Sequence, residues 1–452
     1  MPRLEDSLEL GGLTVPNRLY RAPLLECAGT GPDAADRLVA DLEPAAEAGA
    51  GLLCQGATIV REGPGGCAAP NMTYVDDPDF VSSLSALTER VHDHGSRVAI
   101  QLEHGGLRSM ETWNAAYRAE HPGIEQLAVS DPPLPLRLAD RVGLLSLSPH
   151  VMTTAEVYEL AADFGRAAER AVDAGYDVIH LAGANMGIVH QFLSPFYNRR
   201  DDEFADGVRF LELVHDEVRE RAGDVPLVTK VPAETEVPPV IRRRLTHRDA
   251  VGVCRRLADY GYDALVPVNG TVIWDMSIVR GEFPSRAWDD ETFEDAYVGT
   301  FGGRLRRMLV ELGNRAESLV FGFESTWNAD LARDVRRVVD VPVLLEGGVR
   351  ERGEMDRLLG DACDMVGMAR PFYAEPRLPA RLLAAGSGTD DRDADASTRV
   401  DPGTRTVCES CNNCTVPQAV GAPGVCRTPS VLRRAGELRR RGAYETAGRN
   451  PD

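Results

Sequence analysis

The sequence predicts a parallel α/β fold, most simply a (β/α)8 or TIM barrel, followed by a C-terminal extension built around a cysteine cluster. Two observations lead to this prediction. Residues 1–385 alternate short apolar segments with segments of helical periodicity, which is the pattern of a parallel sheet covered by helices. Four of the nine cysteines are crowded between Cys408 and Cys426, beyond the last of these segments.

Nine apolar segments are candidate strands for the eight places of such a barrel. In chain order they are residues 18–22, 51–59, 97–102, 177–182, 226–231, 263–268, 317–321, 341–345 and 364–368. We expect residues 317–321 to be an extension rather than a barrel strand. Helices are predicted between many of them, most clearly from Thr154 to Gly175, over residues 247–261 and over residues 328–339.

Two long segments interrupt the alternation and are expected to shape a substrate site. Residues 105–150 form an insertion after the third strand. Residues 270–316 form a second one, with aromatic side chains at Trp274, Trp288, Tyr297 and Phe301. We predict three regions: a barrel over 1–385, an acidic linker over 386–406, and a cysteine-cluster segment with a basic helical tail over 407–452.

The composition excludes several classes of function. The net charge is −20 and the pI about 5.0, which argues against binding to nucleic acid or to an anionic membrane surface. No segment approaches the ~18 apolar residues of a membrane helix, and the first residues lack the features of a signal peptide. An odd number of cysteines, unevenly placed, favours a reducing compartment, so we expect a cytoplasmic location.

Lys230 is the only lysine among 50 Lys and Arg residues. It ends an apolar segment, PLVTK, that reads as a buried strand. Charged side chains at the C-terminal ends of barrel strands line active sites. We therefore expect its ammonium group to serve an anionic group of a cofactor or substrate.

Residues 344–376 have the pattern of a phosphate site. One predicted strand ends in Gly347–Gly348, and the next ends in the sequence Gly367-Met-Ala-Arg370. Glycines at strand ends let the backbone approach a phosphate, and the amides of the following helix and an arginine bind it.

The ordered set of motifs resembles the Old Yellow Enzyme family of FMN-dependent, NADH:flavin oxidoreductase-like enzymes. The strings that carry the resemblance are VPNRLYRAPLLECAG, LLCQGATIV, IQLEHGG, QFLSPFYNRRDDEF and VTKVP, besides the phosphate pattern. The resemblance covers residues 1–385. It implies an FMN site formed by Pro23, Leu24, Leu25, Ala57, Gln101, Lys230, Gly347, Gly348, Gly367, Ala369 and Arg370. In that site Lys230 would face flavin N1 and O2, where a positive charge favours the reduced flavin.

The substrate side departs from the family pattern. The two positions that usually hold the substrate carbonyl are Ala182 and Asn185, and the usual tyrosine acid is Gly187. The resemblance therefore leaves Asn185, His104 and Lys230 as the candidate catalytic residues. His180, His190, Glu26 and Cys27 are further candidates for the missing groups.

The spacing Cys408-x2-Cys411-x2-Cys414-x11-Cys426 is suited to a metal site with four thiolate ligands. A [4Fe–4S] cluster, a tetrahedral zinc and an empty site are the alternatives. The spacing resembles the cluster motif of the family branch that contains trimethylamine dehydrogenase and 2,4-dienoyl-CoA reductase. Members of that branch usually continue into a dinucleotide-binding region, so we expect here either an electron-transfer protein or direct reduction of FMN by NAD(P)H.

The predicted function is reduction of an activated C=C bond of a small molecule by an FMN enzyme, with electrons from NAD(P)H or from an iron–sulfur partner. Three alternatives remain: an amine or C–H dehydrogenase or demethylase, a flavin and iron–sulfur electron carrier, and a flavin-free barrel with a zinc site. A homo-oligomer is expected in each case from the resemblance.

Overall fold

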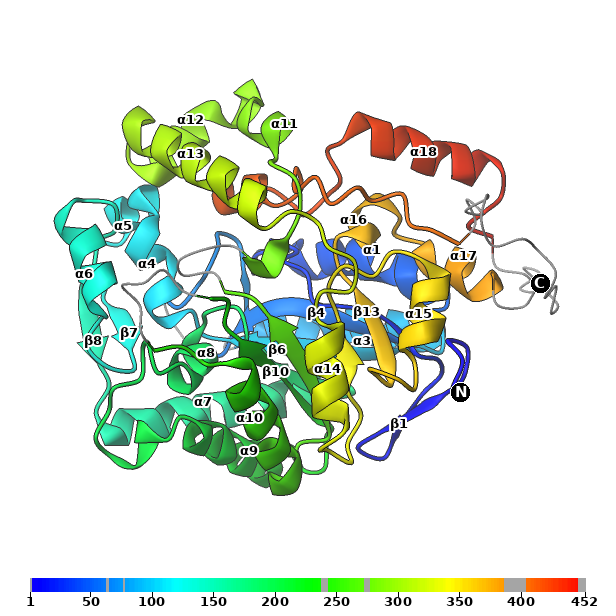
Figure 1. The fold of residues 1–452 in the computed structure, drawn as a ribbon, viewed down its shortest axis with the longest axis horizontal. Helices are drawn as coiled ribbons and strands as arrows, with labels where there is room; N and C mark the ends of the chain where they lie inside the picture. Colours follow the sequence, from blue (N-terminus) through cyan, green and yellow to red (C-terminus); the bar gives the residue numbers. More distant parts are fainter. Residues whose placement is uncertain are drawn as a thin grey trace.

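The computed structural model describes residues 2–61, 65–75, 78–236, 243–271, 277–385 and 404–445. Within these residues eight parallel strands form a barrel, which confirms the predicted fold (Figure 1). A parallel bridge between Leu265 and Val343 joins the first and last strands of the sheet path. The barrel strands are β3 (Leu19–Arg21), β4 (Leu52–Ile59), β6 (Arg97–Glu103), β9 (Val178–Leu181), β10 (Leu227–Ala233), β11 (Ala264–Asn269), β12 (Leu344–Leu345) and β13 (Met365–Met368).

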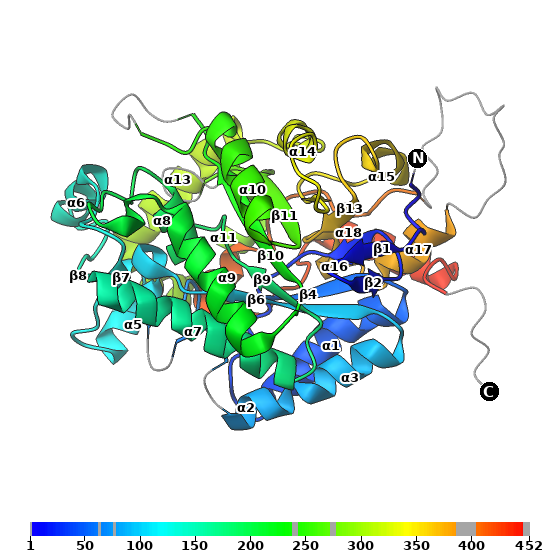
Figure 2. The same ribbon diagram turned by 90° about the horizontal axis from the view of Figure 1, so that it is seen from below.

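Helices follow the strands and cover the outside of the barrel (Figure 2). The principal ones are α1 (Ala34–Glu47), α3 (Ser85–Asp93), α7 (Thr154–Asp173), α9 (Val208–Ala222), α10 (His247–Tyr260), α14 (Ala329–Arg336), α15 (Arg352–Leu358) and α17 (Leu378–Ala384). Shorter elements are β5 (Thr73–Tyr74), α2 (Pro78–Ser83), α8 (Ile188–Leu193) and α16 (Pro371–Ala374). Helix α7 begins at a capping box, in which Thr153 and Glu156 satisfy each other's backbone amides.

Two apolar layers hold the barrel together. One cluster draws residues from all eight barrel strands and none from the helices, so it fills the barrel interior. The hairpin of β1 (Leu8–Leu10) and β2 (Leu13–Val15) adds residues to the same cluster. A larger cluster contains the inward faces of α1, α3, α7, α9, α10 and α14 and the outer faces of the strands. Because side chains alternate along a strand, membership of the inner cluster fixes which strand residues point into the barrel.

The two predicted insertions both exist and touch each other. The first carries α4 (Met110–Trp113), α5 (Ala115–Glu120), β7 (Gln126–Ala128), α6 (Leu134–Arg141) and β8 (Pro149–Val151). The second carries α11 (Ser285–Trp288), α12 (Glu294–Phe301) and α13 (Arg304–Val320). Helix α12 packs on α5, with the rings of Trp113 and Phe301 6.4 Å apart.

Residues 317–321 are not a strand of any kind. Glu317–Val320 is instead the last turn of α13, and Leu319 and Val320 are exposed. The strand assignment was wrong because a short apolar segment at the end of an amphipathic helix looks like a strand when only its composition is considered.

The C-terminal segment returns to the barrel. Residues 386–403 of the predicted linker lie outside the described residues. From Thr404 onward the chain pairs with the start of α15 through a Glu351–Arg405 bridge, then forms η5 (Val416–Val420) and α18 (Pro429–Arg440). The predicted tail helix is thus confirmed, and Val431 buries it against the α16 region. None of the helices in the described ranges combines the length and apolarity needed to cross a membrane.

Candidate active site

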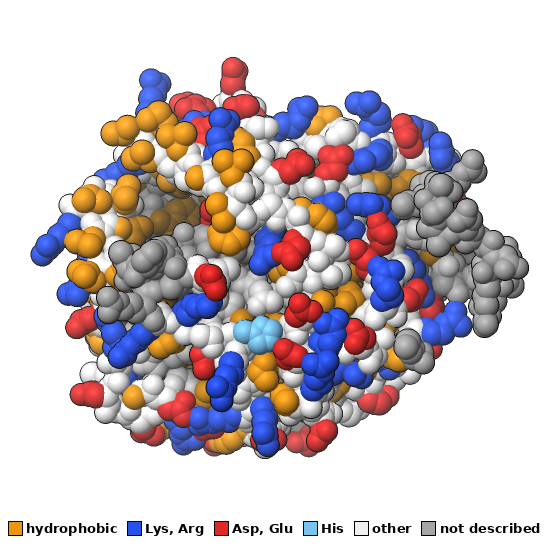
Figure 3. All heavy atoms as spheres, viewed as in Figure 1, with side chains coloured by type: hydrophobic (Ala, Val, Ile, Leu, Met, Phe, Trp, Pro, Cys, Tyr) orange, Lys and Arg blue, Asp and Glu red, His pale blue; other side chains and the backbone are white. Residues whose placement is uncertain are grey.

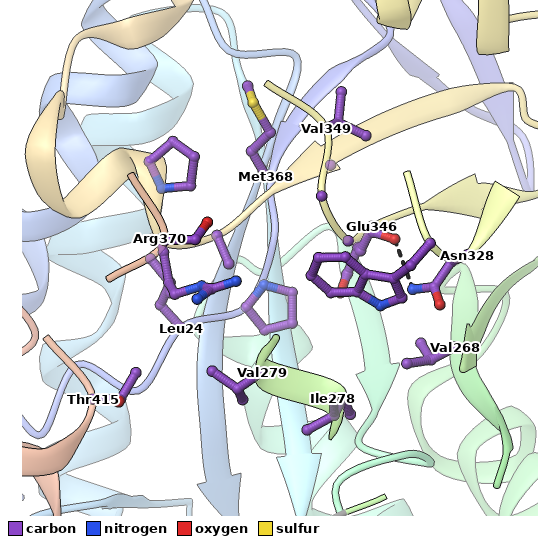
Figure 4. A pocket seen from close by; sticks show the side chains of 18 of the residues that line it. Leu24, Val268, Ile278, Val279, Asn328, Glu346, Val349, Met368, Arg370 and Thr415 are labelled. Carbon is purple, nitrogen blue, oxygen red and sulfur yellow. Dashed lines mark hydrogen bonds between the residues drawn. The ribbon is translucent and has the colours of Figure 1, made fainter. Parts of the chain in front are cut away.

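A cavity of about 250 Å³ lies at the C-terminal ends of the barrel strands. Figure 4 shows Arg370 and Leu24 on one side of it and Glu346, Asn328 and Val268 on the other, with Val279 and Ile278 along the lower edge of the view. Ten residues predicted from the sequence line this cavity: Pro23, Leu24, Leu25, Asn185, Lys230, Gly347, Gly348, Gly367, Ala369 and Arg370. They come from five different strand ends and their loops, so the barrel brings together segments far apart in the chain.

Lys230 is buried in β10 and does not stand alone. Its Nζ lies 2.7 Å from Oε2 of Glu346, the residue just before Gly347. The second carboxylate oxygen of Glu346 accepts a hydrogen bond of 2.7 Å from the Tyr20 hydroxyl. The cationic side chain is therefore paired with a carboxylate at the wall of the cavity, a partner that the sequence analysis missed.

The part of the cavity around the glycine pair and two arginines is suited to an anion. Gly347 and Gly348 have φ values of +101° and +76°, and side chains there would meet Trp327 and its neighbours at less than 3 Å. Arg370 lines the wall and donates to Asn412 and to the carbonyl of Arg280. Arg350 stacks on Phe323, 3.6 Å from its ring centroid. The sequence analysis missed Arg350, which follows the glycine pair by two residues.

Orphaned polar atoms show that this end is built for a bound group. Trp327 Nε1 and Arg350 Nη2 are buried at the cavity without a hydrogen-bond partner among the described residues. Buried donors without partners are costly and call for an explanation. Together with the two glycines, they fit the phosphate end of FMN.

Gln101 and Ala57 lie side by side in the pairing of β6 with β4, but neither lines the cavity. Gln101 donates a hydrogen bond of 3.1 Å to Nδ1 of His180. Nε2 of His180 is then a buried donor without a partner in the described part of the chain. His180 is thus a member of this inward-facing polar pair, and burial lowers its pKa well below the usual value.

The other candidate groups are engaged elsewhere. His104 is buried outside the cavity lining, where Nδ1 accepts from the Gly106 amide, and burial lowers its pKa to about 3. His190 contacts Glu234 at 3.2 Å. Glu26 binds Arg21 and the Gly56 amide, and burial raises its pKa. Cys27 is buried, which raises its pKa to about 12.

The described aromatic residues of the second insertion do not line this cavity. Trp288 is buried against Tyr297 and Phe301, with the Arg307 guanidinium over its ring. Trp274 lies outside the described residues. The tryptophan at the cavity is Trp327, in the loop that leads into α14.

The cysteine segment packs directly against the cavity. Ser410, Thr415 and Gln418 line it, and Gln418 donates to the carbonyl of Leu25 and to the Tyr373 hydroxyl. Next to it lies a cavity of about 20 Å³ lined by Arg370, Tyr373 and the four predicted ligands Cys408, Cys411, Cys414 and Cys426. Three residues line both cavities: Arg370, Tyr373 and Ser410.

The four thiols are a soft donor set around one small space. In the geometry of the described residues, however, no three His, Cys, Asp or Glu side chains meet as a metal site. Burial raises the pKa of Cys408 and Cys426, and that of Cys414 to about 12, whereas Arg370 lowers the pKa of Cys408 and Cys414. The donor chemistry of the four thiols fits a metal.

Comparison with known proteins agrees with this geometry. The model of the NADH:flavin oxidoreductase / NADH oxidase family matches residues 6–293. The NADPH dehydrogenase of Geobacillus thermodenitrificans is 31% identical over 356 residues, which are 75% of this chain and 96% of that protein. The cinnamate reductase of Clostridium sporogenes is 24% identical over 402 residues, covering 84% of this chain and 52% of that protein.

One solved structure has the same fold over nearly the whole chain. It is the 6-hydroxypseudooxynicotine amine oxidase of Pseudomonas geniculata, with a TM-score of 0.67 and 19% identity, covering 97% of this chain and 55% of that one. The chain thus spans about half the length of the cinnamate reductase and of this amine oxidase.

Proposed function

Because the chain belongs to the NADH:flavin oxidoreductase / NADH oxidase family, and is therefore a flavin-dependent oxidoreductase, we propose that it reduces an activated C=C bond of a small molecule with electrons from NAD(P)H. The observation that carries the proposal is the cavity at the barrel mouth, whose lining combines Lys230 with the glycine pair and two arginines. The names of the NADPH dehydrogenase and the cinnamate reductase among its relatives support the same reaction class.

The residues present would hold FMN in one orientation. Arg350, Arg370 and the Gly347–Gly348 backbone would bind the phosphate, and Lys230 would face the pyrimidine end of the ring. Pro23 and Leu24 would form the apolar floor beneath the ring. Bound FMN supplies hydride chemistry, which the protein's own side chains do not. The barrel contributes orientation, a cation near the pyrimidine and exclusion of water.

We further propose a [4Fe–4S] cluster on Cys408, Cys411, Cys414 and Cys426. The shared lining by Arg370 and Tyr373 supports electron exchange between the two cofactors. Zinc in the same site is the competing outcome. A cluster next to the flavin would allow a separate electron-transfer protein to supply electrons in place of NAD(P)H.

A homo-oligomer in the cytoplasm completes the proposal. Figure 3 shows hydrophobic side chains gathered over the α12–α13 region, and α13 has no buried residue. Leu305, Leu312 and Leu319 are exposed by 66%, 52% and 84%, which supports self-association of this face. All nine cysteines are free, in keeping with a reducing compartment.

The first test is the absorption spectrum of anaerobically purified protein before and after NADPH or NADH. We expect a flavin spectrum over a broad iron–sulfur shoulder, with the flavin bands bleached by nicotinamide. Two unbleached chromophores would point to a protein electron donor or to an amine that reduces the flavin. Protein without flavin would contradict the proposal and leave only the barrel.

A further inference from the structure

Glu103 is a buried carboxyl group at the C-terminal end of a barrel strand. It lies within the motif IQLEHGG, which assigned it no role, and it adjoins the cavity through the lining residue Arg108 rather than lining the cavity itself. It is the last residue of β6. Ala99 of the same strand belongs to the cluster inside the barrel, and Gln101 and Glu103 follow at intervals of two residues. Side chains of a strand alternate between its two faces, so Glu103 points into the barrel above Gln101. Only 2% of its surface is exposed.

This carboxyl group lacks the partners that a buried carboxylate needs. Its Oε1 atom has no hydrogen-bond partner in the described part of the chain. The nearest cation, Arg108, keeps its Nη1 atom 3.9 Å away, beyond hydrogen-bonding distance. Burial raises the pKa of Glu103, while the charges of Arg108 and Lys230 act in the opposite direction. A carboxyl group in this setting holds a proton more readily than one in water.

Gly187 makes the space that Glu103 uses. A Cβ atom at Gly187 would lie 3.0 Å from Oε1 and 3.3 Å from Cγ of Glu103. The backbone of Gly187 has a φ of −62°, which any residue adopts, so glycine is not required there by conformation. The missing side chain instead leaves room for the carboxyl group of Glu103, next to the cavity residue Asn185.

Arg108 adjoins both Glu103 and the cavity. It belongs to the 3-10 turn η1 (Gly106–Arg108), lines the cavity and keeps 32% of its side chain exposed. Among the described residues, its contact with Glu103 is the only ion pair that it makes. A guanidinium group with free donors is suited to bind a carboxylate through two parallel hydrogen bonds.

We propose that Glu103 is the proton donor of the reaction and that Arg108 binds the carboxylate of the substrate, which makes the substrate an α,β-unsaturated carboxylic acid. This inference rests on the proposed function and adds its acid and its substrate class.

The step balances as the addition of one hydride and one proton. NAD(P)H is the reductant, and the flavin, when bound, would supply the hydride that the β-carbon of the C=C bond accepts. The O–H bond of Glu103 breaks, and its proton forms the new C–H bond at the α-carbon. The π bond is lost, the substrate is reduced to the saturated acid, and Glu103 is left as a carboxylate. Solvent at the mouth then returns a proton to Glu103.

Binding of the substrate carboxylate to Arg108 would raise the pKa of Glu103 and keep it protonated. The charge of Arg108 lowers the pKa of Glu103 in the free protein. A carboxylate paired with Arg108 cancels much of that charge, so the pKa of Glu103 rises and the proton is retained until it is transferred. An uncharged ester of the same substrate would not have this effect.

The test measures only the reoxidation of the reduced flavin by the substrate, without NAD(P)H. Holoenzyme reduced anaerobically with dithionite is mixed with trans-cinnamate, and recovery of the flavin absorbance gives the rate. We expect Glu103→Gln to slow this rate about 10²-fold or more, the range of a lost general acid, without loss of bound FMN. Glu103→Asp should recover part of the rate. The matched control is Glu111→Gln, which alters another buried glutamate outside the cavity lining.

Two further readouts separate catalysis from a structural effect. The rate of the unmodified protein should fall at high pH as Glu103 loses its proton, and the Glu103→Gln rate should lack this decline. Arg108→Leu should raise the concentration of cinnamate needed for half-maximal rate about tenfold or more, with little change for methyl cinnamate. Unchanged rate and pH profile in Glu103→Gln would overturn the role of Glu103.

Failure of the proposed function gives a different result. If the unmodified, reduced protein is reoxidised by neither cinnamate nor 2-cyclohexen-1-one, the reaction class is wrong and the inference falls with it. If it is reoxidised by cyclohexenone and methyl cinnamate but not by cinnamate, the reaction class stands and the assignment of a carboxylic acid substrate is overturned.

Discussion

Among single residues, the pair of Lys230 and Glu346 decides the charge near the flavin site. The sequence predicted the cation, because one lysine in an arginine-rich chain at a strand end is conspicuous. It did not predict the carboxylate, because Glu346 is 116 residues away and only barrel closure brings the two within 2.7 Å. A paired lysine carries less effective positive charge to a neighbouring group than a lone one.

Glu346→Gln should therefore raise the reduction potential of bound FMN. It removes the negative charge beside Lys230, and an effect of about 1–2 kcal/mol at an effective dielectric constant near 20 corresponds to roughly 20–40 mV for two electrons. The potential is measured by equilibration with a reference dye. Lys230→Ala should shift the potential downward or weaken FMN retention.

Tyr20→Phe is the matched control, because it removes a hydrogen bond to Glu346 and leaves both charges in place. Its potential should move much less than that of Glu346→Gln. Equal potentials in Glu346→Gln and the unmodified protein would show that Lys230 does not act on the flavin.

At the scale of secondary structure, local pattern predicted the eight strands and helices such as α7, α10 and α14, but not α13 and not the packing of the C-terminal segment. Apolar segments bounded by glycine and proline identify buried strands. The contacts between Gln418 and Leu25 join residues 393 apart, and nothing local to either residue announces them. The cysteine spacing indicated a metal site, whereas its position beside the flavin cavity required the structure.

Cys411→Ala should remove the iron–sulfur absorbance and the iron content while FMN remains bound. Cys411 is one of four proposed ligands, and most of the residues proposed to hold FMN belong to the barrel. Metal analysis gives the iron content, and the flavin spectrum of the same sample gives the amount of bound FMN. Cys254→Ala, which alters a buried cysteine of α10, is the control and should keep both. Iron unaffected by Cys411→Ala, or zinc in its place, would contradict the cluster.

At the scale of the whole molecule, the strand ends carry buried polar groups of two kinds, those that line the cavity and those that do not. The sequence pattern did not distinguish the two kinds. Of the inward positions at the strand ends, Lys230 lines the cavity, whereas Gln101 and Glu103 are buried next to its lining; His104 is also buried outside the lining. Because side chains alternate along a strand, the position of Glu103 two residues beyond Gln101 would have placed it on the inward face. No local signal distinguishes a buried structural histidine such as His104 from a catalytic one.

Burial of neutral histidine makes the stability of the fold depend on pH. The pKa of His104 is lowered to about 3 by burial, whereas in the unfolded chain it lies near the usual value of about 6.5. As the pH falls below about 6.5, His104 binds a proton in the unfolded state but not in the folded state. The free energy of the unfolded state therefore falls relative to that of the folded state. From pH 7 to pH 5 this one group should cost about 2 kcal/mol of unfolding free energy.

Urea unfolding of the holoenzyme at pH 7 and pH 5 tests this linkage. His104→Gln removes the titrating group, so its stability should fall by about 2 kcal/mol less between the two pH values than that of the unmodified protein. His247→Gln is the control, because His247 has a side chain that is 45% exposed. Any loss of packing in His104→Gln appears at both pH values and cancels in the comparison. An identical pH dependence in His104→Gln and the unmodified protein would mean that His104 is accessible to protons in the folded state, and the closed packing of the barrel mouth around it would have to be revised.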